Sequence, residues 1–142
     1  MTALVLGVGR MGTAIAYAMD KLGFHVIGVD TNREAANNIP KKVNLEDGKT
    51  PANEFFVIDD VNDLNKAISY HKHIVDVVIS SLPYHQTEAV AHHCIRHGLR
   101  YCDLGGRVDV SESINNLAKE IATKPVFTDL GLAPGWVNIL AE

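Results

Sequence analysis

The sequence predicts an α/β protein with a doubly wound parallel sheet of about six strands in a single domain. Apolar strand-like runs and helix-like stretches alternate along all 142 residues, which is the pattern of repeated strand–helix–strand units. Two of these runs, residues 26–30 and 74–79, are almost continuously apolar. Such runs are typical of parallel strands that are covered on both faces. The length suffices for one core, and ligands are expected at the carboxyl ends of the strands.

The expected elements alternate strictly along the chain. Strands are expected near residues 3–6, 24–30, 54–58, 74–80, 99–103 and 125–128. Helices are expected near residues 11–22, 32–38, 61–70, 86–97 and 110–122. Asp109 and Glu112 are placed as an acidic variant of a capping box at the start of the last helix. The polar, turn-rich segment from Pro40 to Pro51 is expected to form a surface loop.

Composition and charge narrow the class of protein. The net charge of −4, with no basic cluster longer than Lys41-Lys42, argues against a nucleic-acid partner. No apolar stretch approaches the length of a membrane span, and the first strand begins too close to Met1 for a signal peptide. The spacing of Cys94 and Cys102 matches neither a redox motif nor a zinc knuckle, so reduced thiols are expected. We therefore expect a cytoplasmic protein without a membrane partner.

The turn after the first strand has the glycine pattern of a dinucleotide-binding loop, Gly7-x-Gly9-x-x-Gly12. Gly7 permits the tight turn out of the strand, and Gly9 lets backbone N–H groups approach a pyrophosphate. Gly12 lets the following helix pack closely on the sheet, and the pyrophosphate would lie at the positive end of that helix. The alternative is a structural glycine turn in an ordinary α/β domain.

The second strand ends on an acidic residue, Asp30, at the offset expected for a carboxylate that accepts hydrogen bonds from a ribose hydroxyl. Such a carboxylate would bind the free 2′-hydroxyl of NAD and repel the additional phosphate of NADP. Arg10 and Arg33 argue in the other direction, because either side chain could contact a 2′-phosphate. We expect NAD as the cofactor, in preference to NADP.

Three further motifs follow in order in the second half of the chain. They are the segments Asp76 to Tyr84, Tyr101 to Gly106 and Gly131 to Leu140. Together with the glycine loop, they resemble the saccharopine dehydrogenase-like family, which includes saccharopine reductases, carboxynorspermidine dehydrogenases and lysine 6-dehydrogenases. The resemblance covers essentially the whole chain, and it implies a Rossmann fold that binds a nicotinamide dinucleotide.

The resemblance also implies roles for particular residues. Asp60 and Val61 would lie near the adenine, and the segment 81–83 would lie beside the ribose on the nicotinamide side. The glycine loop would hold the pyrophosphate, and Asp30 would bind the adenosine ribose. The complete predicted cofactor site comprises Gly7, Gly9, Arg10, Met11, Gly12, Asp30, Thr31, Asp60, Val61, Ser81, Leu82 and Pro83.

The chain departs from the family pattern in two respects. Saccharopine-type members resemble Gly-Leu-Asp-Pro-Gly in the last motif, whereas this chain has Ala133 at the position of the acid. The Ala-Pro form resembles the lysine 6-dehydrogenase branch, which implies oxidative deamination of a side-chain amine. Full-length members continue into a substrate-binding and dimerising domain. The resemblance therefore implies a dinucleotide-binding domain at residues 1–130 and the start of an absent second domain at residues 131–142.

Histidines gather on the helix expected at residues 86–97 and suggest a metal site. His92, His93 and His97 lie on one face of that helix, whereas Cys94 points to the opposite face. His93 and His97 have the spacing to share a metal, but no third ligand is near them in the sequence. We expect a solvated polar face and no metal.

Two other groups at expected strand ends are open to more than one interpretation. The serines at 80–81 lack the surrounding glycines of a nucleophile elbow, so backbone and ribose contacts are expected instead. Asp103 and Arg107 bracket a pair of glycines after the fifth strand. Asp103 either lines the nicotinamide cleft or caps the loop, and the sequence does not decide between these roles.

These observations predict the NAD-binding half of an oxidoreductase that acts on the amine or imine of an amino acid. The amino-acid substrate would bind only when a second domain is present, and no catalytic residue can be assigned. Apolar residues in the segment 131–142 suggest self-association, so a homodimer is expected at high concentration. The alternative function is a stand-alone, non-catalytic module that binds a dinucleotide or senses redox state.

Overall fold

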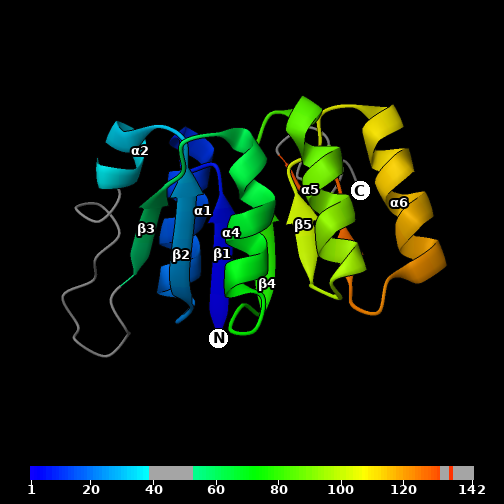
Figure 1. Ribbon diagram of the computed structural model, residues 1–142, viewed down its shortest axis with the longest axis horizontal. Coiled ribbons are helices and arrows are strands. Elements are labelled where there is room, and N and C mark those ends of the chain that lie inside the picture. The colour runs from blue at the N-terminus through cyan, green and yellow to red at the C-terminus, as the bar shows by residue number, and fades with distance from the viewer. Residues whose placement is uncertain (39–52, 132–134, 136–142) are drawn as a thin grey trace.

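Six parallel strands form one sheet in the part of the chain that the structure describes. The computed structural model describes residues 1–38, 53–131 and 135. The strands lie in the order β3-β2-β1-β4-β5-β6, and every neighbouring pair is parallel (Figure 1). Their bounds are β1 Thr2–Leu6, β2 His25–Asp30, β3 Glu54–Val57, β4 Val77–Ser80, β5 Tyr101–Asp103 and β6 Val126–Phe127. This order confirms the predicted doubly wound sheet.

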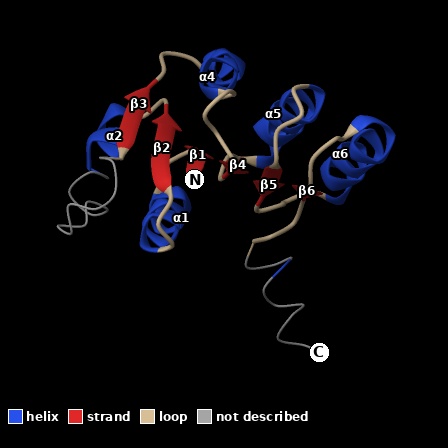
Figure 2. Cartoon of the chain, turned by 90° about the horizontal axis from the view of Figure 1, so that it is seen from below, coloured by secondary structure: helices blue, strands red, loops and turns tan. Residues whose placement is uncertain are grey.

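The helices cover the two faces of the sheet in two groups (Figure 2). Their bounds are α1 Arg10–Lys21, α2 Arg33–Asn38, α4 Leu64–His71, α5 Tyr84–Arg96 and α6 Val108–Ile121, with a 3-10 turn η1 at Val61–Asp63. Helices α1 and α2 share one apolar core, to which they contribute Ala16 and Ala36. Helices α4, α5 and α6 cover the opposite face with Ile68, Val90 and Ile114. No helix of the described residues is long and apolar enough to cross a bilayer.

The central strand β1 shows why its sequence is apolar at successive positions. Leu4, Val5 and Leu6 have no exposed surface. Successive side chains of a strand point to opposite faces, so Leu4 and Leu6 join the core beneath α4, α5 and α6. Val5 joins the core beneath α1 and α2. Burial of each such side chain contributes about 1.5–3 kcal/mol, and both faces of β1 must therefore be apolar.

Two helix starts differ from the predictions. The helix expected from residue 61 begins as the 3-10 turn η1, because the carboxylate of Asp60 accepts a hydrogen bond from the Asn62 backbone and tightens this turn. The capping box predicted at Asp109 is wrong, because α6 begins two residues earlier than expected, at Val108, and Arg107 is its N-cap. Asp109 lies in the first turn of α6 instead, where it pairs with Arg107. The expected surface loop between residues 40 and 51 lies outside the described residues.

Candidate functional site

A cleft of about 300 Å³ opens at the carboxyl end of the sheet, beside the paired strands β1 and β4. The chain reverses its direction of winding between these strands, and ligands of doubly wound sheets bind at this point. Predicted residues that line the cleft are Gly7, Gly9, Asp30, Thr31, Val61, Ser81, Leu82 and Pro83. Lining residues that the sequence did not indicate are Val29, Ile58, Leu64 and Gln86. Predicted residues outside the lining are Arg10, Met11, Gly12 and Asp60.

Two glycines of the loop after β1 are required by the packing of the protein itself. Gly7 has a positive φ of 78°, and a Cβ atom there would lie 3.0 Å from the carbonyl oxygen of Ser81. A Cβ atom at Gly12 would lie 1.8 Å from the carbonyl oxygen of Gly7. The absence of side chains at these two positions therefore lets α1 pack closely against the end of β1, as the glycine pattern predicts.

Gly9 has a different environment, because it lines the cleft and no described protein atom lies within 4 Å of the position of a Cβ there. Its φ of −65° is accessible to any residue. Gly9 is also the N-cap of α1, and no side chain of the described residues caps this end. The first turn of α1 contains no acidic residue. The N–H groups at a helix start need acceptors, and here an anionic ligand could supply them.

The carboxylate of Asp30 ties the glycine loop to the end of β2. Its Oδ2 accepts a hydrogen bond of 2.7 Å from the backbone N–H of Val8, and its Oδ1 accepts one of 2.8 Å from Asn32. Each carboxylate oxygen retains a further lone pair, so Asp30 can still accept hydrogen bonds from a ligand in the cleft. The exposed residues Arg10 and Arg33 begin the two nearby helices α1 and α2.

The segment after β4 forms the opposite wall of the cleft. Ser81 donates its backbone N–H to the carbonyl of Leu6 over 2.8 Å, which continues the β1–β4 pairing beyond the strands. The side chain of Ser80 points away from solvent, because this residue is 1% exposed. Its hydroxyl is buried and interacts with the buried Tyr101. A buried hydroxyl of this kind does not reach a substrate, so Ser80 is unsuited to be a nucleophile.

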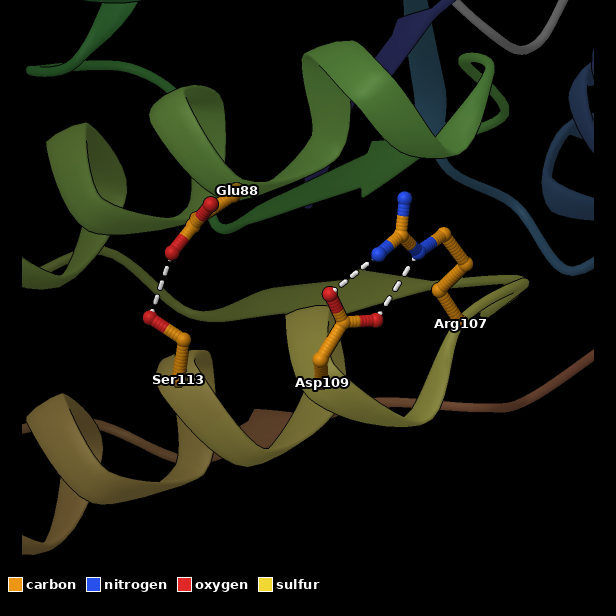
Figure 3. A network of polar contacts seen from close by, with 4 residues as sticks. All are labelled: Glu88, Arg107, Asp109 and Ser113. Carbon is orange, nitrogen blue, oxygen red and sulfur yellow. Dashed lines mark hydrogen bonds and ion pairs between the residues drawn. The ribbon is translucent and has the colours of Figure 1, made fainter.

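Arg107 and Tyr84 meet where the β5–α6 loop faces the start of α5. The guanidinium of Arg107 lies over the Tyr84 ring, 5.4 Å from its centroid. Its Nε and Nη2 donate to the two carboxylate oxygens of Asp109, which holds the guanidinium in one orientation (Figure 3). Farther along the same helices, Ser113 of α6 donates to Glu88 of α5. These contacts fix the two helix starts beside the cleft wall.

The carboxylate of Asp103 connects the loop after β5 to the segment after β6, and Asp103 does not line the cleft. This residue is 2% exposed, and its Oδ1 accepts hydrogen bonds from the backbones of Gly105 and Asp129. Burial raises the pKa of its carboxyl group, against the opposing effect of these two N–H donors. Of the two roles that the sequence left open, the geometry agrees with capping of the loop.

The histidines of α5 lie between its neighbouring helices, with His93 beside α4 and His92 beside Ser113 of α6. His93 Nε2 lies 3.0 Å from the hydroxyl of Ser69. The centroids of the His93 and His97 rings are 4.4 Å apart. Burial lowers the pKa of His93, with a further effect of the neighbouring His97. Cys94 is fully buried on the other side, which confirms its predicted orientation. Within the described residues, no three histidine, cysteine or acidic side chains are grouped to hold a metal ion.

The sheet order, the glycine loop and the cleft at the switch point define the chain as a Rossmann-type domain. A sequence model described as the saccharopine dehydrogenase NADP binding domain matches residues 3–127. The chain therefore belongs to this family, the NAD(P)-binding domains of saccharopine dehydrogenase-like oxidoreductases.

Similar solved structures support the fold. Saccharopine dehydrogenase (L-Glu forming) from Saccharomyces cerevisiae has a TM-score of 0.69 and 24% identity, over 99% of this chain and 29% of that chain. The yeast methylglyoxal/isovaleraldehyde reductase, solved with NADPH, has a TM-score of 0.69 and 13% identity, over 90% of this chain and 53% of that one. A shikimate 5-dehydrogenase from Mycobacterium fortuitum has a TM-score of 0.63 and 20% identity, over 91% and 44%. The chain thus spans about 29–53% of the length of these proteins.

Proposed function

We propose that this chain binds NAD across the cleft between the ends of β1 and β4, with the pyrophosphate at the start of α1. Gly9 is the observation that carries this proposal. The protein has no steric need for glycine at this position, yet Gly9 lines the cleft at a helix start without a side-chain cap. Close approach of a pyrophosphate supplies the missing reason, because any side chain there would occupy the space of the ligand.

The preference for NAD rests on Asp30. Asp30 lies on the lining of the cleft, and we expect its carboxylate to bind the 2′-hydroxyl of the adenosine ribose. A 2′-phosphate at the same place would meet a like charge, which disfavours NADP by roughly 1–3 kcal/mol, or about ten- to hundredfold in affinity. Two features favour NADP instead: the family is named for NADP binding, and Arg10 and Arg33 are exposed at the starts of α1 and α2.

The other cleft residues would complete the binding site. Val61 after β3 would contact the adenine half of the ligand, and the segment 81–83 after β4 would contact the nicotinamide half. Both lie on the lining of the cleft, on opposite sides of the glycine loop in the sheet order. Asp60 would act indirectly, because its carboxylate caps η1 and so positions Val61.

In a longer protein, this domain would present the nicotinamide to the amine or imine carbon of an amino acid. The cofactor supplies hydride transfer, and the protein supplies position and electrostatic environment. Ala133 favours a substrate of the lysine 6-dehydrogenase type, in a cytoplasmic enzyme whose second domain begins near residue 131. Ala133 and the expected homodimer contacts of residues 131–142 lie in a part of the chain where the structure describes only residues 131 and 135.

Calorimetric titration of the chain with NAD and NADP tests the proposed function. The wild-type chain should bind NAD more tightly than NADP, and Gly9→Ala should weaken the binding of both at least about tenfold because its methyl group enters the ligand space. Asn116→Ala, a change at an exposed position of α6, is the control and should bind like the wild type. Unchanged NAD affinity in Gly9→Ala would contradict the placement of the pyrophosphate.

A further inference from the structure

One half of the sheet has a face over which no described helix lies. Helices α4, α5 and α6 cover one side of the sheet, whereas α1 and α2 pack on the other side against β1, β2 and β3 (Figure 2). On that second side, β5 and β6 lack a described helix. The side chains there, which we call the open face, are Val77, Ile79, Cys102 and Phe127, and none of them belongs to either apolar core. Their strand neighbours point the opposite way, into the core beneath α4, α5 and α6: Val78, Tyr101 and Val126.

The open face contains a continuous apolar row across the strands. Ile79 is in register with Cys102, and Cys102 with Phe127. Ile79 is also in register with Val5, so the row continues outward from the core beneath α1. Exposure rises along the row, from 8% at Ile79 to 57% at Phe127. Because contact between apolar surface and water is unfavourable, the outer end of the row favours an apolar partner.

The chain leaves the sheet from β6, the strand that carries Phe127. A Cβ atom at Gly131 would lie 2.3 Å from the carbonyl oxygen of Leu104, and one at Gly135 would lie 2.6 Å from the carbonyl oxygen of Asp129. Both glycines are therefore held close to the carboxyl ends of β5 and β6. Residues 136–142 lie outside the described residues, and they begin at this point.

The segment 136–142 has the composition and the length to cover the open face. Its large apolar residues are Trp136, Val137, Ile139 and Leu140, and Glu142 is its single charged residue. In a helix, Trp136, Ile139 and Leu140 would share one side. A segment of this length spans about 10 Å as a helix and about 23 Å when extended, and neighbouring strands lie about 4.8 Å apart. It can therefore reach from β6 across β5 to β4.

We propose that residues 136–142 pack onto the open face of their own chain, with Trp136 against Phe127 and Cys102. A second copy of the chain offers the same apolar residues, as in the expected homodimer. A segment attached to β6 through residues 131–135, however, has an effective concentration at its own face on the order of millimolar. The chain's own segment therefore occupies the face at micromolar protein concentration. No residue of the open face lines the cleft, so this inference is independent of the proposed function.

The environment of Trp136 tests the inference, because this residue is the only tryptophan of the chain. Its fluorescence is measured in the full 142-residue chain, with acrylamide as the quencher. Compared with the urea-unfolded chain, the docked ring should emit at a shorter wavelength and should be quenched at least about threefold less. Both properties should be the same at all micromolar protein concentrations.

Three variants locate the contact. Phe127→Lys places a charge on the open face and Leu140→Lys places one on the segment, and each should raise the quenching of Trp136 close to that of the unfolded chain, because burial of an unpaired charge is unfavourable. Tyr70→Lys makes a matched change at an exposed aromatic residue of α4, on the other side of the sheet, and should leave the quenching unchanged. If Phe127→Lys does not fold, Leu140→Lys decides alone.

Two kinds of result would overturn the inference. Equal quenching of Trp136 in the native and the unfolded chain would show that the segment is not docked, and protection that survives Phe127→Lys or Leu140→Lys would place the segment elsewhere. Protection that increases with protein concentration would assign the open face to a second copy of the chain.

Discussion

The start of α1 packs so closely on the loop after β1 that a Cβ atom at Gly12 would lie 1.8 Å from the carbonyl oxygen of Gly7. No rotation of a side chain relieves this clash, because both atoms belong to the backbone or are bonded to it. The position of α1 relative to the sheet therefore depends on this pair. Gly9 lies between them in the sequence and has no comparable contact.

The first prediction compares the effects on stability of substituting Gly12, which is required by packing, and Gly9, which lines the cleft. Gly12→Ala should lower the free energy of unfolding by at least about 2 kcal/mol, because the added methyl group forces the helix away from the sheet. Gly9→Ala should lower it by less than about 1 kcal/mol, since only the capping preference changes. Urea unfolding followed by circular dichroism measures both. Equal losses in the two variants would show that the packing account of this loop is wrong.

The second prediction concerns cofactor choice. Asp30→Asn should reduce the ratio of NAD to NADP affinity by about tenfold, because it removes the charge that repels a 2′-phosphate. Glu120→Gln removes a charge from an exposed position of α6 and serves as the control. The affinities follow from calorimetric titration. If the ratio in Asp30→Asn equals that of the wild type, Asp30 does not set the preference.

The third prediction uses the raised pKa of the buried Asp103 carboxyl group. Burial favours its protonated form in the folded state, so the folded protein binds more protons than the unfolded chain above the ordinary pKa of 3.8. Stability from this group is therefore complete below that pH and is lost as the pH rises through the folded-state pKa. Asp103→Asn resembles the protonated acid in shape and should remove this loss.

Urea unfolding of the wild type and of Asp103→Asn at a series of pH values checks the direction of this pH dependence. The free energy of unfolding of the wild type should fall relative to that of Asp103→Asn as the pH increases above 3.8. The opposite trend would mean that the two backbone N–H donors outweigh burial and that the carboxylate is the stable form.

The fourth prediction concerns the cysteines. Burial raises the pKa of the Cys94 thiol to about 12 and that of Cys102 to about 11. The thiolate is the reactive form, so both side chains should react slowly with a thiol reagent near neutral pH. Colorimetric thiol titration should find two accessible thiols only after unfolding. Rapid reaction of either cysteine in the native protein would contradict the burial of Cys94 or the partial burial of Cys102.

The fifth prediction is that the isolated chain binds NAD without oxidising lysine. Orientation of a substrate against the nicotinamide commonly lowers a barrier by about 7–11 kcal/mol, and it requires a wall that faces the cofactor. In the proposed binding mode, the cleft residues would contact only one side of the nicotinamide, and nothing in the described residues would face its other side. Steady NADH formation from lysine by the purified chain, above that of Gly9→Glu, would contradict this expectation.

Periodicity and the glycine motif predicted most of the fold because they depend on local rules. The continuous apolar run of β1 required a strand covered on both faces, and Leu4 and Val5 occupy those two faces. Asp30 was singled out because it ends the second apolar run at the offset from the glycine motif that is typical of a ribose-binding carboxylate. The apolar run, the glycine motif and the acidic strand end each lie within a short segment, so they can be recognised without knowing how distant segments pack.

The rest of the site depends on packing between distant segments. Gln86 reaches the cleft because α5 begins directly after the segment that lines the opposite wall. Asp103 appeared equally suited to two roles, and the structure decides by placing Asp129, 26 residues later, against its carboxylate.

Amide nitrogen–proton spectra of the chain, recorded during titration with NAD, test the central claim most directly. The account predicts that the largest shifts occur at the backbone amides of Val8, Gly9 and the first turn of α1, with smaller shifts after β2 and β4. Amides at the opposite edge of the sheet, such as Gly23 and Gly98, should remain unchanged. Shifts confined to the opposite edge, or no shifts at saturating NAD, would contradict a dinucleotide site at this cleft.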